Sequence, residues 1–269
     1  MEKLYILGTG HAMVTKCYNT CFTIFNGDEH FLVDAGGGNT ILANLQKLDI
    51  SIEKIKHIFI SHKHIDHLLG CIWIIRAFAS RIMKNKNSAA ELNIYACQDV
   101  IKIINAIVEN TLDKKQTATL KDCVTYYKIE DNCNHHILNW YVEFFDIHSK
   151  KEKQFGFRIN LRNNKKLTFL GDEPYYEESY EYANNSDYLL HEAFCLFSQR
   201  EIFQPYEKHH ATVKEACENA RKLNAKNLIL YHTEDDNILE RKKLYRQEGK
   251  NFYSGKIMVP NDLEIIELV

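Results

Sequence analysis

The sequence has few of the features that mark linkers, secretion signals or membrane spans. Only three of its 269 residues are proline, no low-complexity tract occurs, and no apolar run reaches the length of a membrane span. The first ten residues, MEKLYILGTG, lack the charged, apolar and cleavage regions of a secretory signal. These absences predict one soluble, cytoplasmic domain over residues 1–269, with no membrane contact.

An excess of charge of one sign is also lacking. The formal net charge is -2 and no long basic block occurs, which argues against a nucleic-acid footprint over the whole surface. Eight cysteines are present, but none belongs to a CxxC pair. A cytoplasmic chain of this length needs no disulfides, so we predict free thiols that pack mostly as small hydrophobic side chains.

What the chain does have is a regular alternation of strand-like and helix-like stretches, with 45% apolar residues to build a core. Predicted strands are 4–8, 21–25, 30–34, 57–61, 92–96, 140–147, 155–161, 166–171, 188–192 and 227–232, and 256–268 resembles a strand–turn–strand. Predicted helices are 40–48, 68–80, 99–110 and 212–223. Asp99 is the expected N-cap of the third helix, and Thr212 with Glu215 forms a capping box. Two sheets between helical layers would bury this pattern.

The stretch HKHIDH follows one of these strands directly. His62 and His64 are two residues apart, so an extended backbone directs both side chains to one side. Asp66 and His67 follow as the chain turns into a helix. Imidazole and carboxylate groups are good zinc ligands and bind iron or manganese less selectively. Four such residues in six positions predict a metal site.

Three other apolar runs end in a residue of the same chemistry: His148, Asp172 and His232. Together these residues satisfy what a site for two divalent metal ions requires. We expect one ion to bind His62, His64 and His148, the other to bind Asp66, His67 and His232, and Asp172 to bridge them. A water shared by the ions would lose its proton near neutral pH and become a nucleophile.

These motifs resemble those of the metallo-β-lactamase superfamily, through the HxHxDH signature and the order of the later ligands. FLVDAG, with Asp34, is similar to the early strand-end aspartate of that superfamily, which is usually structural. The resemblance implies an α/β (α+β) chain folded as a four-layer αββα sandwich, with the metals at one edge between the sheets.

Two further motifs resemble the tRNA 3′-end endonucleases, the tRNase Z branch. YLLHEAF contains Glu192 and EKHHATVKEA contains His210. The match implies a Glu192–His210 pair beside the metals, with the imidazolium as the general acid that protonates a leaving alkoxide. Asp66 would orient or deprotonate the attacking water. His191 and His209 are expected to be supporting residues, His11 to line the mouth of the site, and His135 and His136 to lie in a loop.

The tRNase Z enzymes usually carry a long arm that grips tRNA, between the strands that here are FGFRINL and KLTFLGD. Only RNNKK and its neighbours connect these strands, which predicts a tight hairpin and argues against full tRNA as a substrate. We therefore expect a dinuclear phosphodiesterase, with zinc or alternatively manganese or iron, acting on a small phosphodiester or a short nucleic acid. A thioester or lactone hydrolase, a non-catalytic metal- or ligand-binding sensor and a di-iron redox centre are alternatives, and a homodimer stays open.

Overall fold

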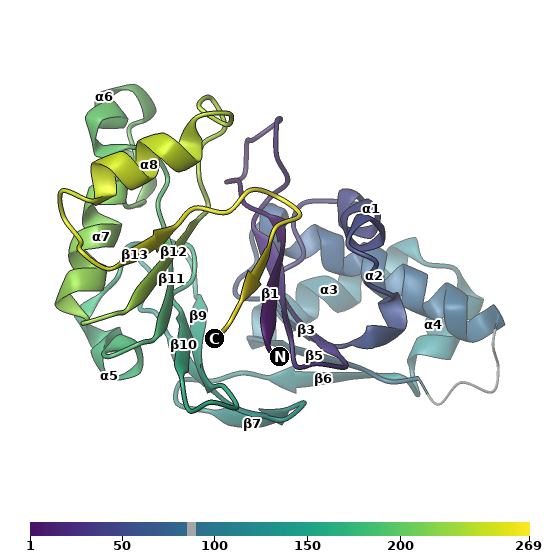
Figure 1. Cartoon of the computed structure of the whole chain (residues 1–269). Helices are drawn as coiled ribbons and strands as arrows, with labels where there is room; N and C mark the ends of the chain where they lie inside the picture. The colour runs from purple at the N-terminus through teal and green to yellow at the C-terminus, as the bar shows by residue number, and fades with distance from the viewer. Residues whose placement is uncertain (85–89) are drawn as a thin grey trace. The chain divides into compact units, whose positions relative to one another are not determined.

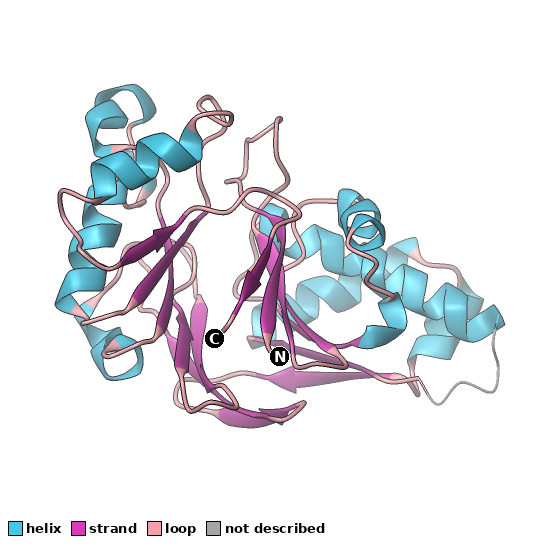
Figure 2. Ribbon diagram, in the orientation of Figure 1, coloured by secondary structure: helices cyan, strands magenta, loops and turns pink. Residues whose placement is uncertain are grey.

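The computed structural model describes residues 1–84 and 90–269, which form two compact units. Unit 1 comprises Met1–Gly8, Tyr18–Ile129 and Leu263–Val269, and unit 2 comprises Thr9–Cys17 and Glu130–Asp262. Each unit contains one seven-stranded sheet, and Figures 1 and 2 show the strands and helices of both. In each sheet three strand pairings are antiparallel and three are parallel.

The sheet of unit 1 has the strand order β14-β1-β2-β3-β4-β5-β6. Its strands are β1 (Lys3–Gly8), β2 (Cys21–Phe25), β3 (His30–Val33), β4 (Ile55–Phe59), β5 (Leu92–Ala96), β6 (Val124–Lys128) and β14 (Ile265–Glu267). The helices are α1 (Thr40–Lys47), α2 (Ile65–Lys84), α3 (Gln98–Thr111), α4 (Lys114–Leu120) and the 3-10 helix η1 (Ile52–Lys54). In Figure 1 the four α-helices lie along one face of this sheet.

The sheet of unit 2 has the strand order β13-β12-β11-β10-β9-β8-β7. Its strands are β7 (Asn134–Ile137), β8 (Trp140–Asp146), β9 (Phe155–Asn160), β10 (Lys166–Phe169), β11 (Tyr188–Glu192), β12 (Asn227–Tyr231) and β13 (Lys256–Met258). The α-helices are α5 (Tyr180–Ala183), α6 (Arg200–Phe203), α7 (Val213–Lys222) and α8 (Arg241–Gly249). The 3-10 helices are η2 (Glu177–Ser179), η3 (Phe197–Gln199) and η4 (Tyr206–Lys208).

The core of unit 2 shows why the alternation in the sequence produces this layering. Leu189 of β11 and Leu228 and Leu230 of β12 pack in one buried cluster with Val213 and Cys217 of α7. The apolar residues of α7 fall three and four positions apart, so they form one stripe along the helix. The capping box predicted at the start of α7 is present, with the Thr212 backbone N–H donating to Glu215 Oε2 at 2.9 Å. The predicted fold class, two sheets flanked by helices, is confirmed.

Several local predictions were wrong. The N-cap of α3 is Cys97 and not Asp99, which lies in the first turn of that helix. His135 and His136 belong to β7 and not to a loop, because they pair with Val142 and Tyr141 of β8. The polar stretch 111–138 contains α4, β6 and β7, and α8 had not been predicted at all.

Other predictions are confirmed. All eight cysteines are free thiols. The β9–β10 connection is a tight hairpin, in which the Leu161 backbone N–H donates to the carbonyl of Lys165 at 2.8 Å. Among the described residues, no helix is both long enough and apolar enough to pass through a lipid bilayer.

Candidate metal centre

The histidine-rich turn of unit 1 follows β4, which ends at Phe59, and leads directly into α2. His62 and His64 precede the helix, while Asp66 and His67 lie in its first turn. All of these side chains are buried except that of His64, which is half-buried. The sequence places them there because the buried strand ends just before them and the long apolar helix begins just after them.

Asp34 anchors this turn from the end of β3, the parallel neighbour of β4. Its carboxylate accepts hydrogen bonds from the Ser61 backbone N–H and the Ser61 hydroxyl, each at 2.8 Å, and lies 2.8 Å from His67 Nδ1. The φ of Asp34 is 51°, a left-handed conformation that is costly for a residue other than glycine. A carboxylate on Nδ1 fixes the imidazole so that Nε2 of His67 is the nitrogen available to a metal.

The possible ligand atoms of the turn are closely spaced. His62 Nε2 lies 2.8 Å from His64 Nδ1, and His67 Nε2 lies 3.3 Å from Asp66 Oδ2. His62 Nδ1 lies 2.9 Å from the Ser61 hydroxyl, which directs the opposite nitrogen toward His64. Two ligands of one tetrahedral zinc ion are roughly 3.4 Å apart when each bond is about 2.1 Å. The spacing in this turn is therefore close to that of ligands on a common ion.

Gly70 lets α2 approach the loop after β3. Its backbone N–H donates to the carbonyl of Gly36 at 2.8 Å, and the Ala35 backbone N–H donates to the carbonyl of His67 at 2.9 Å. A Cβ atom at position 70 would lie 1.8 Å from the carbonyl oxygen of Ala35. Any larger residue there would push the helix, and with it His67, away from Asp34.

In unit 2 four strands bring candidate residues to one edge of the sheet. β10, β11 and β12 are mutually parallel, and β8 runs in the same direction because β8 and β10 are both antiparallel to β9. The carboxyl ends of strands with the same direction meet at the same edge, where sites of α/β sheets commonly lie. The residues at these ends are His148, Asp172, Glu192 and His232.

Asp172 is the centre of a buried cluster in unit 2. Its Oδ1 lies 3.2 Å from His232 Nδ1 and 3.6 Å from His210 Nδ1. The ligand atoms of these three residues lie within 4.8 Å of one another. His210 comes from the loop before α7, so the cluster combines two strand ends with a helix entry. This group of a carboxylate and two imidazoles has a composition that suits a divalent ion.

Glu192 and His210 form the pair that the resemblance implied. Glu192 Oε2 lies 3.3 Å from His210 Nδ1, and the other carboxylate oxygen accepts a hydrogen bond from the Ala211 backbone N–H. Burial raises the pKa of the Glu192 carboxyl well above its ordinary value, although His232 acts in the opposite direction. This shift favours the protonated carboxyl of Glu192 over its carboxylate. The Phe194 ring stacks on His210, with ring centroids 4.9 Å apart and planes 7° apart, and holds the imidazole in place.

Other predicted residues lie at the edge of this cluster or outside it. His148 is exposed at the end of β8, with a φ of 58°, and does not belong to the cluster of Asp172, His210 and His232. Its assignment as a ligand stays a prediction. His209 is exposed, whereas His210 beside it is buried.

His191 and His11 have distinct surroundings. His191 is fully buried, with Nδ1 2.7 Å from the carbonyl of Glu192 and Nε2 3.1 Å from Asn219 Nδ2. Burial lowers the pKa of His191 to about 4, so it is a neutral, structural histidine. The His11 ring lies 4.6 Å from that of Phe194 and 6.3 Å from that of His232, between centroids. Burial lowers the pKa of His11 to about 4 as well.

Three residues at these clusters were not found from the sequence: Ser61, Phe194 and Lys151. The Nζ of Lys151 lies 3.3 Å from His210 Nε2. Each of the three is within three positions of a residue that the motifs did single out, which is the only signal the sequence offers for them. Serine, phenylalanine and lysine are too common for their identity alone to indicate a role.

The donor set of both clusters fits divalent metal ions. Neutral imidazoles and carboxylates predominate, no thiolate is among the candidate ligands, and most of the groups are buried. Buried carboxylates and imidazoles without a cation between them would be costly to desolvate. Zinc, manganese and iron all accept such ligands, so the residues do not select one metal.

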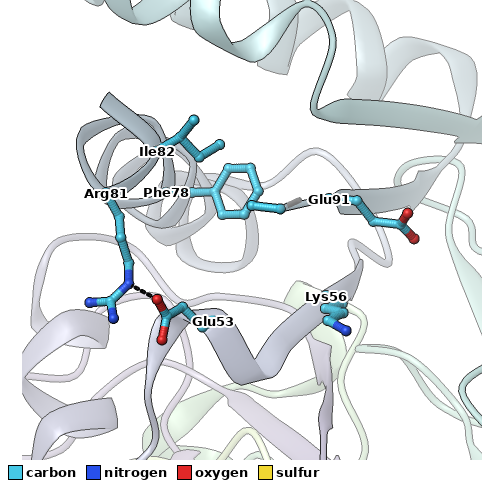
Figure 3. Close-up of a pocket in the computed structure, with 7 residues that line it drawn as sticks. Glu53, Lys56, Phe78, Arg81, Ile82 and Glu91 are labelled. Atoms are coloured by element: carbon cyan, nitrogen blue, oxygen red, sulfur yellow. Dashed lines mark hydrogen bonds and ion pairs between the residues drawn. The ribbon is translucent and has the colours of Figure 1, made fainter. Parts of the chain in front are cut away.

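A separate cavity of about 170 Å³ lies in unit 1, lined by residues of α2, η1 and β4 and by Ala90 and Glu91, which precede β5. Figure 3 shows the residues that line it, among them Phe78 and Ile82 of α2. Its Arg81 and Glu53 are paired with each other, and none of its lining residues is a candidate ligand. The cavity is therefore no part of the candidate metal centre.

Comparisons with known proteins agree with the resemblance. The family model described as Anti-Pycsar protein Apyc1 matches residues 2–252. A ribonuclease Z from Methanocaldococcus jannaschii is 27% identical, over 99% of this chain and 97% of that protein. The crystal structure of the metallo-β-lactamase fold protein YhfI from Bacillus subtilis matches with a TM-score of 0.79 at 19% identity, over 98% of each chain. The short form of human tRNase Z matches with a TM-score of 0.77 at 19% identity, over 99% of each chain.

The resemblance to the metallo-β-lactamase superfamily, and to its tRNase Z-like branch, is thereby confirmed. The fold of the chain is the metallo-β-lactamase fold, and its buried His and Asp clusters could hold metal ions.

Proposed function

The chain belongs to the Anti-Pycsar protein Apyc1 family, and from this premise we propose that it is a dinuclear metal-dependent phosphodiesterase acting on small nucleotides. Degradation of cyclic nucleotides is associated with that family. We place the substrate class accordingly: a phosphodiester small enough to be bound without an RNA-gripping arm, with cyclic nucleotides as the first choice.

The metal ligands in this proposal are the seven residues expected from the sequence: His62, His64, Asp66, His67, His148, Asp172 and His232. The ions they would hold, zinc in the first instance, supply activation of a water and neutralisation of charge on the phosphoryl group. Asp66 orients or deprotonates the attacking water. The Asp34 carboxylate keeps His67 in one orientation, since it is bonded to Nδ1 of that ring.

The Glu192–His210 pair is the observation that supports a phosphodiesterase most strongly. Hydrolysis of a phosphodiester releases an alkoxide, which needs a proton. His210 stacks on the Phe194 ring, and its Nδ1 lies 3.3 Å from Glu192 Oε2, which orients Nε2 away from that carboxyl group. Thioester and lactone hydrolases of the superfamily do not need this pair. A sensor without activity would need neither the pair nor an intact set of ligands.

Cleavage of tRNA precursors is the second candidate, because ribonuclease Z is the curated relative named above. The β9–β10 hairpin argues against it, since the chain turns within residues 161–165 where the arm of tRNase Z enzymes usually lies. Binding of a full tRNA through several phosphates would give a steep dependence of affinity on salt concentration.

A substrate panel tests this proposal. The zinc-loaded protein is given bis(p-nitrophenyl) phosphate, nucleoside 3′,5′-cyclic monophosphates, a tRNA precursor, a thioester and a lactone, with its metal content measured on the same sample. We expect two ions per chain, turnover of the phosphodiesters and the highest kcat/KM for a cyclic nucleotide. Preference for the thioester or the lactone would overturn the proposal, and preference for the tRNA precursor would favour the second candidate.

A further inference from the structure

We propose that Lys151 binds the phosphoryl oxygens of the substrate beside His210. This inference rests on the proposed function, because it places the phosphodiester next to the general acid. Lys151 lies in the loop between β8 and β9, with a half-buried side chain whose Nζ is 3.3 Å from His210 Nε2.

The charge of Lys151 is not neutralised by an ion pair, unlike that of a neighbouring lysine. Lys153 pairs with Asp146, and Lys150 lies over the ring of Tyr176 at 5.3 Å from its centroid. Within the described residues no carboxylate forms an ion pair with Lys151. An ammonium group only donates hydrogen bonds, so its contact with His210 makes Nε2 the acceptor. A neutral imidazole is a weaker partner for an ammonium than an anionic phosphoryl oxygen.

The loop that carries Lys151 is held rigidly. The carboxylate of Glu173 is fully buried, and it accepts hydrogen bonds from the Ser149 hydroxyl at 2.6 Å and from the backbone N–H groups of Lys150 and Lys151 at 3.1 and 3.3 Å. The Tyr176 hydroxyl donates to the same carboxylate at 3.2 Å. A binding group on a preorganised loop loses less entropy when the ligand arrives. The hydrogen bonds to Glu173 thus fix the backbone position of Lys151 within unit 2.

The chemistry places a phosphoryl group at this point. If His210 Nε2 protonates the leaving oxygen, that oxygen lies within hydrogen-bond distance of Nε2. The non-bridging oxygens of the same phosphoryl group then lie within reach of an ammonium that is itself 3.3 Å from Nε2. The arriving oxygens can therefore take over the hydrogen bond that Lys151 donates to Nε2.

Binding of inorganic phosphate to the zinc-loaded protein, measured by calorimetry, tests the proposal without turnover. We expect Lys151→Met to weaken phosphate binding about 10-fold or more, and Lys151→Arg to retain most of the affinity. Lys150→Met is the matched control, because it removes an exposed charge one residue away, and it is expected to change the affinity less than about 2-fold.

Phosphate affinity of Lys151→Met within about 2-fold of the wild type would overturn the proposal, and so would an equal loss in the Lys150→Met control. A wild-type protein that binds no phosphate would overturn it as well. Turnover of bis(p-nitrophenyl) phosphate on the same samples separates the two hypotheses. A selective loss of phosphate binding without wild-type turnover would leave Lys151 as an anion site and reject the phosphodiesterase. Turnover by the wild type, together with unchanged phosphate binding in Lys151→Met, would reject the role of Lys151 and support the phosphodiesterase.

Discussion

The two candidate clusters are built in opposite ways. In unit 1 all four candidate ligands come from six consecutive positions, and one carboxylate from the neighbouring strand anchors them. In unit 2 Asp172, His210 and His232 are separated by at least 22 residues each, and they meet because two strands of one direction end at the edge where the loop before α7 lies. The first cluster is therefore sensitive to local changes of one turn, and the second to the integrity of a whole sheet.

Removal of a ligand from the compact cluster should have the largest effect. We expect Asp66→Ala to lower turnover of bis(p-nitrophenyl) phosphate by at least about 10³-fold, because the proposed function makes Asp66 both a metal ligand and the group that orients the water. Asp99→Ala, which removes an exposed carboxylate of α3, is the control and should retain wild-type turnover. An Asp66→Ala enzyme with wild-type turnover and metal content would contradict the assignment of the whole HKHIDH turn.

Loss of the proposed proton donor in unit 2 should have a smaller effect that depends on the leaving group. His210→Ala is expected to slow release of a poor leaving group by about 10²–10³-fold, and release of nitrophenolate, which needs no proton, by less than 10-fold. His209→Ala is the matched control, since that side chain is adjacent but exposed. Equal losses on both substrates would argue against a general acid, and an equal effect of the control would locate the function elsewhere.

Loss of the Asp34 carboxylate in unit 1 should lower metal affinity without abolishing it. Asp34→Asn keeps the size of the side chain but weakens its bond to His67 Nδ1, so zinc affinity should fall by about 10–100-fold. Zinc content at equilibrium with a competing chelator measures this change. Asp28→Asn, on the exposed surface, should leave the affinity unchanged. An unchanged affinity in Asp34→Asn would mean that the turn holds its shape without the carboxylate.

The smallest effect concerns a buried neutral histidine in each unit. Burial lowers the pKa of His30 in unit 1 to about 4, as it does for His191 in unit 2. The unfolded chain binds a proton at these residues below pH 6.5, whereas the folded chain does not until about pH 4, so stability falls as the pH is lowered through this range. The free energy of unfolding falls as the pH is lowered from 7 to 5.5, and this fall should be about 1 kcal/mol smaller in His30→Gln than in the wild type. Urea unfolding of the metal-free wild type and variant at both pH values measures this difference. The same pH dependence of unfolding free energy in both proteins would show that His30 is already protonated in the fold.

The strands and the compact cluster could be predicted because their signals are local. Apolar runs of five to seven residues give the central strands of both sheets, and the HxHxDH pattern gives four candidate ligands at once. The helix α4, within the stretch 111–138, was not predicted because it is short and polar, although Asp113 and Gln116 form a capping box at its start. The helix α8 was not predicted because it is rich in charged residues. Its buried Arg241 donates hydrogen bonds to the hydroxyls of Thr233 and Thr9 and to the carbonyl of Pro260.

What the sequence could not supply was the conformation of the strand ends and the contacts across the sheet. Asp34, His148 and His232 all have left-handed φ values, between 51° and 58°. Nothing in their residue types predicts this, because the surrounding structure enforces it. The contact of Lys151 with His210 joins positions 59 residues apart, and no spacing rule relates them.

Turnover before and after removal of metal tests the central claim most directly. The protein is stripped with a chelator, its metal content is measured, and hydrolysis of bis(p-nitrophenyl) phosphate and a 3′,5′-cyclic nucleotide is followed as zinc is returned. The account predicts no turnover in the stripped protein and full recovery at two ions per chain. Turnover that survives complete metal removal, or no turnover with two ions bound, would contradict it.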